Sequence, residues 1–111
     1  MPAKSGSVRP PRIARLLALG RRFDGMVRSG VVRDYTELAR IGHVTRARMT
    51  QIMNLLNLAP DIQEYLLWLP AGRSHGITER ELRRVAAEVH WDRQRALFLP
   101  YEKAAEGNPA A

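Results

Sequence analysis

The sequence predicts an all-α fold of five to six helices, on three observations. Apolar residues recur three and four positions apart in successive segments, which is the spacing of one helix face. No segment shows the alternation of apolar and polar residues that a half-buried strand requires. Capping residues, glycines and prolines separate the helical segments, and a length of 111 residues suits a single small domain.

The first helix is expected over residues 12–29. Pro11 suits its first turn and Gly30 suits its C-terminal cap. Gly20 lies on the apolar face, where the missing side chain would permit a close helix crossing, at a cost of about 1 kcal/mol relative to Ala. Residues 1–11 are rich in Pro, Gly and Ser, and we expect them to form a disordered basic arm.

A helix-turn-helix core is expected over residues 34–56. Asp34 opens the first of its two helices and has capping-box spacing to Glu37. Leu38 and Ile41 are expected to point inward from this short helix. The pair of helices is therefore predicted to be joined by a tight turn.

The turn of this motif departs from the usual pattern. A small residue in the first helix, here Ala39, is usually followed four positions later by a glycine with a left-handed backbone. His43 occupies that position, and Gly42 precedes it. Either His43 adopts a positive φ, which it tolerates better than a β-branched residue does, or the turn shifts onto Gly42. Val44 is then expected to fill the core, and Thr45 to cap the next helix.

The second helix of the motif has an inward and an outward side. Its inward side is formed by Met49, Ile52, Met53 and Leu56. Its outward side suits DNA, because Gln can pair with adenine and Arg with guanine through two hydrogen bonds. The side chains expected at base edges are Arg46, Ala47, Thr50 and Gln51. Those expected at phosphates, which a helix N-terminus also attracts, are Thr36, Thr45, Arg48 and Asn54. The alternative is a solvated helix face without a ligand.

Two further helices are expected directly after the motif. One begins at Pro60, ends at Pro70 and is followed by a loop over residues 71–76. The next is opened by Thr78 and Glu81, which have the spacing of a regular capping box. Its inward residues are expected to be Leu82, Val85, Ala86 and Val89.

A last helix is expected over residues 91–99. Pro100 is expected to end it, because proline lacks the N–H that a helix interior requires. The helical domain would then cover residues 12–100. Small residues dominate 101–111, and we expect this segment to be a disordered tail.

The whole chain has a net charge of +7, and the positive charge is concentrated in one half of it. Residues 1–56 contain 11 Lys and Arg against 3 Asp and Glu, whereas residues 57–111 contain 7 against 8. The basic half includes the helix-turn-helix, so the charge favours a polyanionic partner, which we expect to be double-stranded DNA. A solvated, Arg-rich surface without a partner is the alternative.

Composition argues against several other classes of protein. The absence of cysteine excludes disulfides and thiolate metal sites. No apolar run approaches the roughly 18 residues of a membrane span, and no secretory signal is evident, which favours a cytoplasmic, nucleoid-associated protein. The three histidines share no metal-ligand spacing, and neither a Gly-rich phosphate loop nor a Ser nucleophile motif is present. We therefore expect no metal, no cofactor, no small-molecule substrate and no enzymatic activity.

A series of short blocks gives the chain a family resemblance over about residues 34–88. The blocks are Leu38-Ala39, Val44-Thr45, Gln51-Ile52, the run from Leu55 to Pro60, Ile62-Gln63 and Gly76-Ile77-Thr78. In content and spacing they resemble the central DNA-binding domain of ParB/KorB-type partition proteins. The resemblance implies a helix-turn-helix that continues through an amphipathic helix into a helix beginning with Ile-Thr. Where the family usually has His-Ala after Ile-Thr, this chain has Glu79-Arg80.

Other motifs and domains of that family are not evident in the sequence. There is no Arg-rich nucleotide-binding motif and no evident C-terminal dimerisation domain. The resemblance therefore implies a stand-alone, bacterial ParB-like module, of the kind found in phages and mobile elements. It implies a transcriptional regulator or a recombination or partition accessory, without nucleotide hydrolysis or clamp sliding.

Two other functions and the role of the tryptophans stay open. An RNA-binding or nonspecific nucleic-acid protein would favour exposed aromatic residues, yet the basic half has only Phe23 and Tyr35. An interaction adaptor with a nonspecific basic surface would use the near-neutral C-terminal half. Trp68 and Trp91 are expected to close the small core, and the alternative is an apolar patch for a homodimer or a partner protein.

Overall fold

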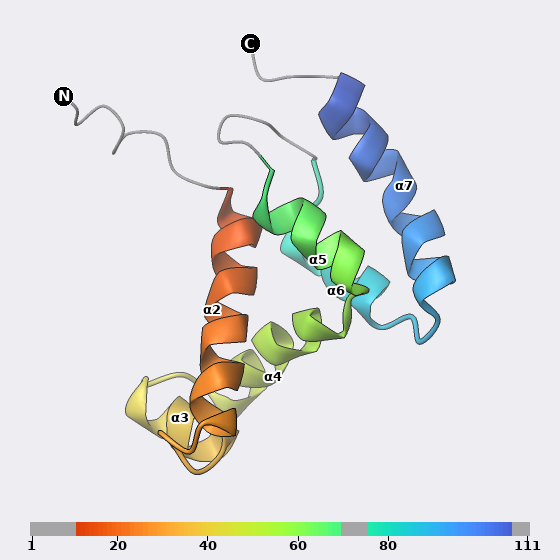
Figure 1. Cartoon of the computed structure of the whole chain (residues 1–111). Helices are drawn as coiled ribbons and strands as arrows, with labels where there is room; N and C mark the ends of the chain where they lie inside the picture. Colours follow the sequence, from red (N-terminus) through yellow and green to blue (C-terminus); the bar gives the residue numbers. More distant parts are fainter. Residues whose placement is uncertain (1–10, 70–75, 108–111) are drawn as a thin grey trace, which may run out of the picture.

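The longest helix of the N-terminal half, α2 (Arg12–Arg28), contacts both apolar clusters of the protein. The computed structural model describes residues 11–69 and 76–107 (Figure 1). Gly30 follows α2 with φ +82°, as the expected C-terminal cap requires. Gly20 is buried where α2 crosses the following helices, and a Cβ there would lie 3.4 Å from Cγ2 of Ile52. The expected close crossing is therefore present.

Two short helices follow α2 in the lower part of Figure 1, and the smaller apolar cluster joins them to the C-terminal part of α2. They are α3 (Tyr35–Ile41) and α4 (Arg46–Asn54). The cluster contains Val32, Leu38, Ala39 and Met49. Ile41 is 55% exposed, so the expectation that it points inward is wrong. It is the last residue of a seven-residue helix, beyond the part of α3 that packs on the cluster.

The larger cluster joins the N-terminal part of α2 to the C-terminal half. A 3₁₀ turn, η1 (Leu55–Asn57), extends α4 and leads into α5 (Pro60–Leu67), and α6 (Glu79–Ala86) packs on η1. The buried residues of this cluster are Ile13, Leu17, Leu55, Leu58, Ala59, Ile62, Leu66, Ile77, Leu82, Val85, Ala86 and Phe98. Among the described residues the secondary structure is therefore six α-helices and one 3₁₀ turn, and the all-α prediction is confirmed.

The last helix, α7 (Trp91–Gly107), continues past Pro100, so the expected end at residue 99 is wrong. Residues 101–107, expected to be part of a disordered tail, are helical. Packing on both sides of the proline explains the continuation: the buried Phe98 precedes Pro100, and the buried Ala105 follows it. These contacts offset the backbone hydrogen bond that proline cannot make. The remaining tail, residues 108–111, lies outside the described residues.

Three apolar side chains expected in the core are exposed. Trp68 is 78% exposed and Trp91 49% exposed, so the expectation that they close the core is wrong. Val89 is 83% exposed, because α6 ends at Ala86 and the helical stripe does not reach it. The alternative, an apolar patch for a homodimer or a partner protein, stays a prediction.

Some expectations fall on residues that the structure does not describe. These are the basic arm over residues 1–10, the helix end at Pro70 and most of the loop over residues 71–76. Gly76, the last residue of that loop, is described and has φ +71°. In the described part of the chain, no helix combines the length and the apolar character that crossing a bilayer would demand.

Candidate nucleic-acid interface

The turn between α3 and α4 depends on His43. Its φ is +56°, whereas Gly42 has φ −84°, so the left-handed residue is His43 and the turn does not shift. The N–H of His43 donates to the carbonyl of Arg40 over 3.4 Å, and the N–H of Val44 to that of Ala39 over 2.9 Å. These two bonds form a Schellman motif, which satisfies the last carbonyls of α3. Val44 follows the turn and is half-buried rather than fully buried.

Thr45 begins α4 as expected. Its Oγ1 accepts the N–H of Arg48 over 3.0 Å, which satisfies one of the free amides at the helix N-terminus. Asp34 caps α3 in the same way, with 2.8 Å to the N–H of Glu37. The carboxylate of Glu37 accepts from the N–H of Arg33 instead of Asp34, so the capping box of α3 is only half formed. Both helices therefore have their starts set by bonds within a few residues.

One side of α4 faces solvent. Its exposed residues are Arg46, Ala47, Thr50 and Asn54. At 100° per residue they cover an arc of about 100°, opposite the buried Met49 and Ile52. The Thr50 hydroxyl donates to the carbonyl of Arg46 over 3.0 Å, and among the described residues Arg46 has no ion pair. Thr45 is exposed at the N-terminus of α4, and Thr36 is exposed in the first turn of α3. The structure thus brings six of the eight expected DNA contacts to the surface.

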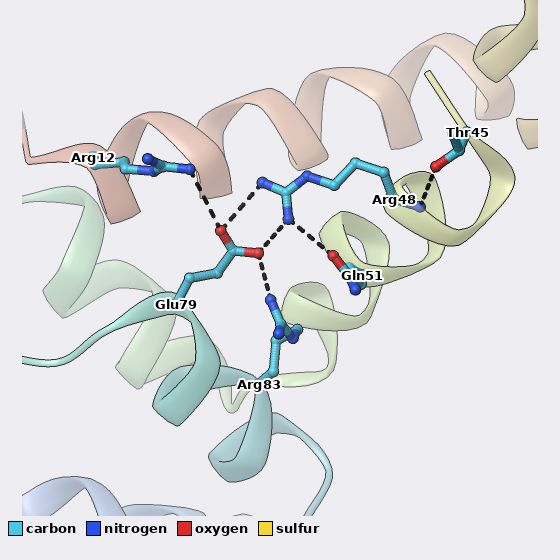
Figure 2. A network of polar contacts seen from close by, with 6 residues as sticks. All are labelled: Arg12, Thr45, Arg48, Gln51, Glu79 and Arg83. Carbon is cyan, nitrogen blue, oxygen red and sulfur yellow. Dashed lines mark hydrogen bonds and ion pairs between the residues drawn. The ribbon is translucent and has the colours of Figure 1, made fainter.

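Arg48 and Gln51 lie on the flank of α4, half-buried and bonded to each other (Figure 2). Nη1 of Arg48 donates to Oε1 of Gln51 over 3.0 Å. The same guanidinium donates through both of its terminal nitrogens to the carboxylate of Glu79, with 3.1 Å between Nη2 and Oε1. The expectation that Gln51 faces freely outward is therefore wrong, and the charge of Arg48 is engaged within the protein.

Glu79, the first residue of α6, is the centre of this network. Its side chain is 14% exposed, and its carboxylate also accepts from Nη1 of Arg83 over 2.6 Å, while Nη2 of Arg12 lies 3.9 Å from the carboxylate. The hydrogen bond from Arg48 is the main cause that lowers the pKa of Glu79. The same bond raises the pKa of Arg48. Both groups are therefore charged at neutral pH.

Sequence reasoning attributed no interface role to Glu79. The available signal was its position directly after Ile77-Thr78, where the resembled family usually has His. The ion pair itself could not be inferred, because Glu79 and Arg48 are 31 residues apart. Contact between them requires α4 and α6 to pack side by side, as they do here.

The described residues contain no group of three or more His, Asp or Glu placed to hold a metal ion. No family model, curated protein or solved structure matches this chain. The described features that bear on function are the exposed side of α4 and the contacts of Glu79.

Proposed function

We propose that this protein binds double-stranded DNA sequence-specifically, with α4 in the major groove. The observation that supports the proposal most is the solvent-facing side of α4, where polar and cationic side chains gather opposite the buried side. The major groove admits a helix of this kind, and α3 braces α4 through the left-handed turn at His43. In this proposal Arg46, Ala47, Thr50 and Gln51 meet base edges.

Phosphate contacts would flank the base contacts. Thr36, Thr45 and Asn54 are exposed at or near the start of α3, the start of α4 and the end of α4. They can donate hydrogen bonds to phosphate oxygens and so fix the position of α4 in the groove. In this proposal Arg48 does not contact a phosphate, because Glu79 and Gln51 already accept hydrogen bonds from its guanidinium. Its role in the proposal is to hold neighbouring residues.

The wider context of the proposal is a stand-alone ParB-like module. The blocks that resemble ParB/KorB proteins extend from α3 to the residues directly before α6, and the basic half of the chain contains both short helices. Such a module would act as a transcriptional regulator or as a recombination or partition accessory. It would be cytoplasmic and bound to the nucleoid.

Selection from a random duplex library at physiological salt tests the proposal. Purified protein should retain duplexes with a shared motif, and a palindromic motif would indicate a homodimer and give its half-site spacing. Arg46→Ala should weaken binding to the selected site by about tenfold or more. Arg93→Ala, an exposed arginine of α7, is the matched control and should bind as the wild type does. Retention without a motif would contradict specific recognition, and no retention would contradict DNA binding.

A second candidate function is an interaction adaptor with a nonspecific basic surface. The observation in its favour is the exposure of Trp68, Trp91, Val89 and Leu97, which lie in the C-terminal half. Exposed apolar residues of this size suit a protein partner or a second copy. In the same selection, an adaptor would retain duplexes of unrelated sequence equally well or retain none.

A further inference from the structure

In the hydrogen bonds between Glu79, Arg48 and Gln51, chemistry fixes which group donates and which accepts. An arginine guanidinium only donates hydrogen bonds, and an ionised carboxylate only accepts them. Arg48 donates to both carboxylate oxygens of Glu79 and, through the same Nη1, to Gln51. The atom of Gln51 that faces Arg48 must therefore be its carbonyl oxygen. The orientation of the amide follows from this chemistry.

The other end of the Gln51 amide is consequently a pure donor. With Oε1 directed at Arg48, Nε2 is on the opposite side of the amide group (Figure 2). Among the described residues nothing accepts a hydrogen bond from Nε2, whereas the other two glutamines of the chain, Gln63 and Gln94, both donate to backbone carbonyls. Gln51 thus has two N–H groups available on the flank of α4.

Base edges differ in how they meet such a donor. Reading adenine through two bonds requires Gln to donate to N7 and to accept from N6. Guanine presents two acceptors, N7 and O6, in the major groove. With Oε1 turned toward Arg48, Gln51 presents the two N–H groups of Nε2 and suits the guanine edge. A Gln51 whose amide is free to rotate can present an N–H and the oxygen together and suits adenine.

We propose that Glu79 is a positioning residue that, through Arg48, orients Gln51 to select guanine over adenine at one position of the DNA site. The inference rests on the proposed function, because it names what one residue of that interface reads. Glu79 acts from α6 without touching the base. Arg12 and Arg83 hold the carboxylate from two other sides, so its position does not depend on Arg48 alone.

Removal of the carboxylate should release the whole arrangement. In Glu79→Gln the three arginines around this position lose the negative charge that holds them together, and Arg48 is repelled by Arg83. Gln51 then regains its rotational freedom and its acceptor oxygen. Glu64→Gln is the matched control, since it removes the same charge from an exposed glutamate of α5 that has no ion pair among the described residues.

The test compares base preferences after selection from a random duplex library. Gln51→Ala identifies the position that Gln51 reads. At that position the wild type and Glu64→Gln should prefer guanine. In Glu79→Gln the ratio of guanine to adenine among the selected duplexes should fall by about tenfold. Arg48→Met, which breaks the same chain of contacts in its middle, should give the same change. Thermal unfolding of each variant shows that the comparison is made on folded protein.

Two results would overturn the inference while leaving the proposed function standing. One is an unchanged preference in both Glu79→Gln and Arg48→Met, and the other is a wild-type preference for adenine at the Gln51 position. Failure of the wild type to select any duplex would overturn the proposed function itself and, with it, the base-reading role. NMR of the free protein tests the contacts of Glu79 separately from DNA binding. Exchange of the Arg48 Nη protons should be slow in the wild type and fast in Glu79→Gln.

Discussion

At the scale of single residues, His43 determines how α3 and α4 meet. Its left-handed backbone permits the Schellman bonds that end α3, so that α4 begins three residues later at Arg46. Histidine adopts this region at a moderate cost, and a β-branched residue adopts it only under strain. The orientation of the whole exposed side of α4 therefore depends on one backbone angle.

Substitutions at His43 should separate backbone strain from side-chain effects. His43→Gly should stabilise the fold slightly, by about 0.5 kcal/mol, since relief of strain exceeds the added unfolded-state entropy. His43→Val should lower the free energy of unfolding by about 1–2 kcal/mol. Urea unfolding measures both. His90→Val, at a position without positive φ, is the control, and an equal loss there would contradict the backbone explanation.

Glu79 gives a second prediction at this scale, in the pH dependence of stability. Its pKa lies below the ordinary value of 4.5 in the folded protein, chiefly because of the hydrogen bond from Arg48. A lowered carboxyl pKa stabilises the fold fully above the unfolded value, and the contribution is lost as pH falls through the folded value. The free energy of unfolding of the wild type should therefore exceed that of Glu79→Gln by about 1 kcal/mol at pH 7. This difference should shrink below pH 4.5.

Urea unfolding at several pH values between 7 and 3 measures that difference. Glu64→Gln should show a small difference from the wild type that does not change in this way. A constant difference between wild type and Glu79→Gln across the range would mean that the ion pairs of Glu79 do not contribute through its ionised form.

At the scale of elements, a buried glutamine anchors α7 to the rest of the protein. Gln94 is 1% exposed, and its Oε1 accepts the N–H of Ala59 over 2.7 Å. Its Nε2 donates to the carbonyls of Asn57 and Glu88, over 3.1 and 2.8 Å. One side chain thus connects α7 to the η1–α5 junction and to the end of α6. The ring of Phe98 packs edge-on against Tyr65, one turn further along α7.

Replacement of this side chain should loosen α7. Gln94→Leu leaves the buried N–H of Ala59 without an acceptor, which should cost about 2–3 kcal/mol of stability. Arg93→Leu, on the neighbouring exposed position, should cost less than about 0.5 kcal/mol. Hydrogen exchange should show the amides of α7 losing protection first. If α4 lost protection to the same extent, α4 and α7 would belong to one cooperative unit.

At the scale of the whole molecule, the excess of positive charge and the two exposed tryptophans lie in different halves of the sequence. Residues 1–56 hold the excess of arginine, and the exposed tryptophans lie in residues 57–111. A positive field over one half attracts and orients a polyanion before any specific contact forms. Among the described acidic residues, Glu79 is the one whose side chain is bonded to a side chain of α4.

Salt dependence of duplex binding measures this charge. For the wild type, log K should fall against log salt with a slope of about −2 or steeper, because each neutralised phosphate contributes about −0.9. Glu79→Gln should steepen the slope by about 1, since it frees the charge of Arg48 for a phosphate. Glu64→Gln should leave the slope unchanged. A flat wild-type slope would favour the adaptor function over DNA binding.

Features set by neighbouring residues were predictable from the sequence. Each cap at Thr45, Asp34 and Thr78 joins the capping side chain to the backbone N–H three residues later, so the bond depends on the type of the capping residue alone. The helical class and the buried side of α4 follow from apolar spacing for the same reason. The exposed residues Arg46, Ala47, Thr50 and Asn54 were predictable because they lie opposite that buried side.

What the sequence by itself determined is thus the helices, most of their starts and the exposed side of α4, because short-range hydrogen bonds and helical periodicity set them. Tertiary structure alone decided that Arg48 pairs with Glu79, that α7 continues past Pro100 and that the tryptophans stay exposed. Each of these depends on which helix faces pack together. Contacts between residues 31 or 37 positions apart leave no periodic trace in a single chain.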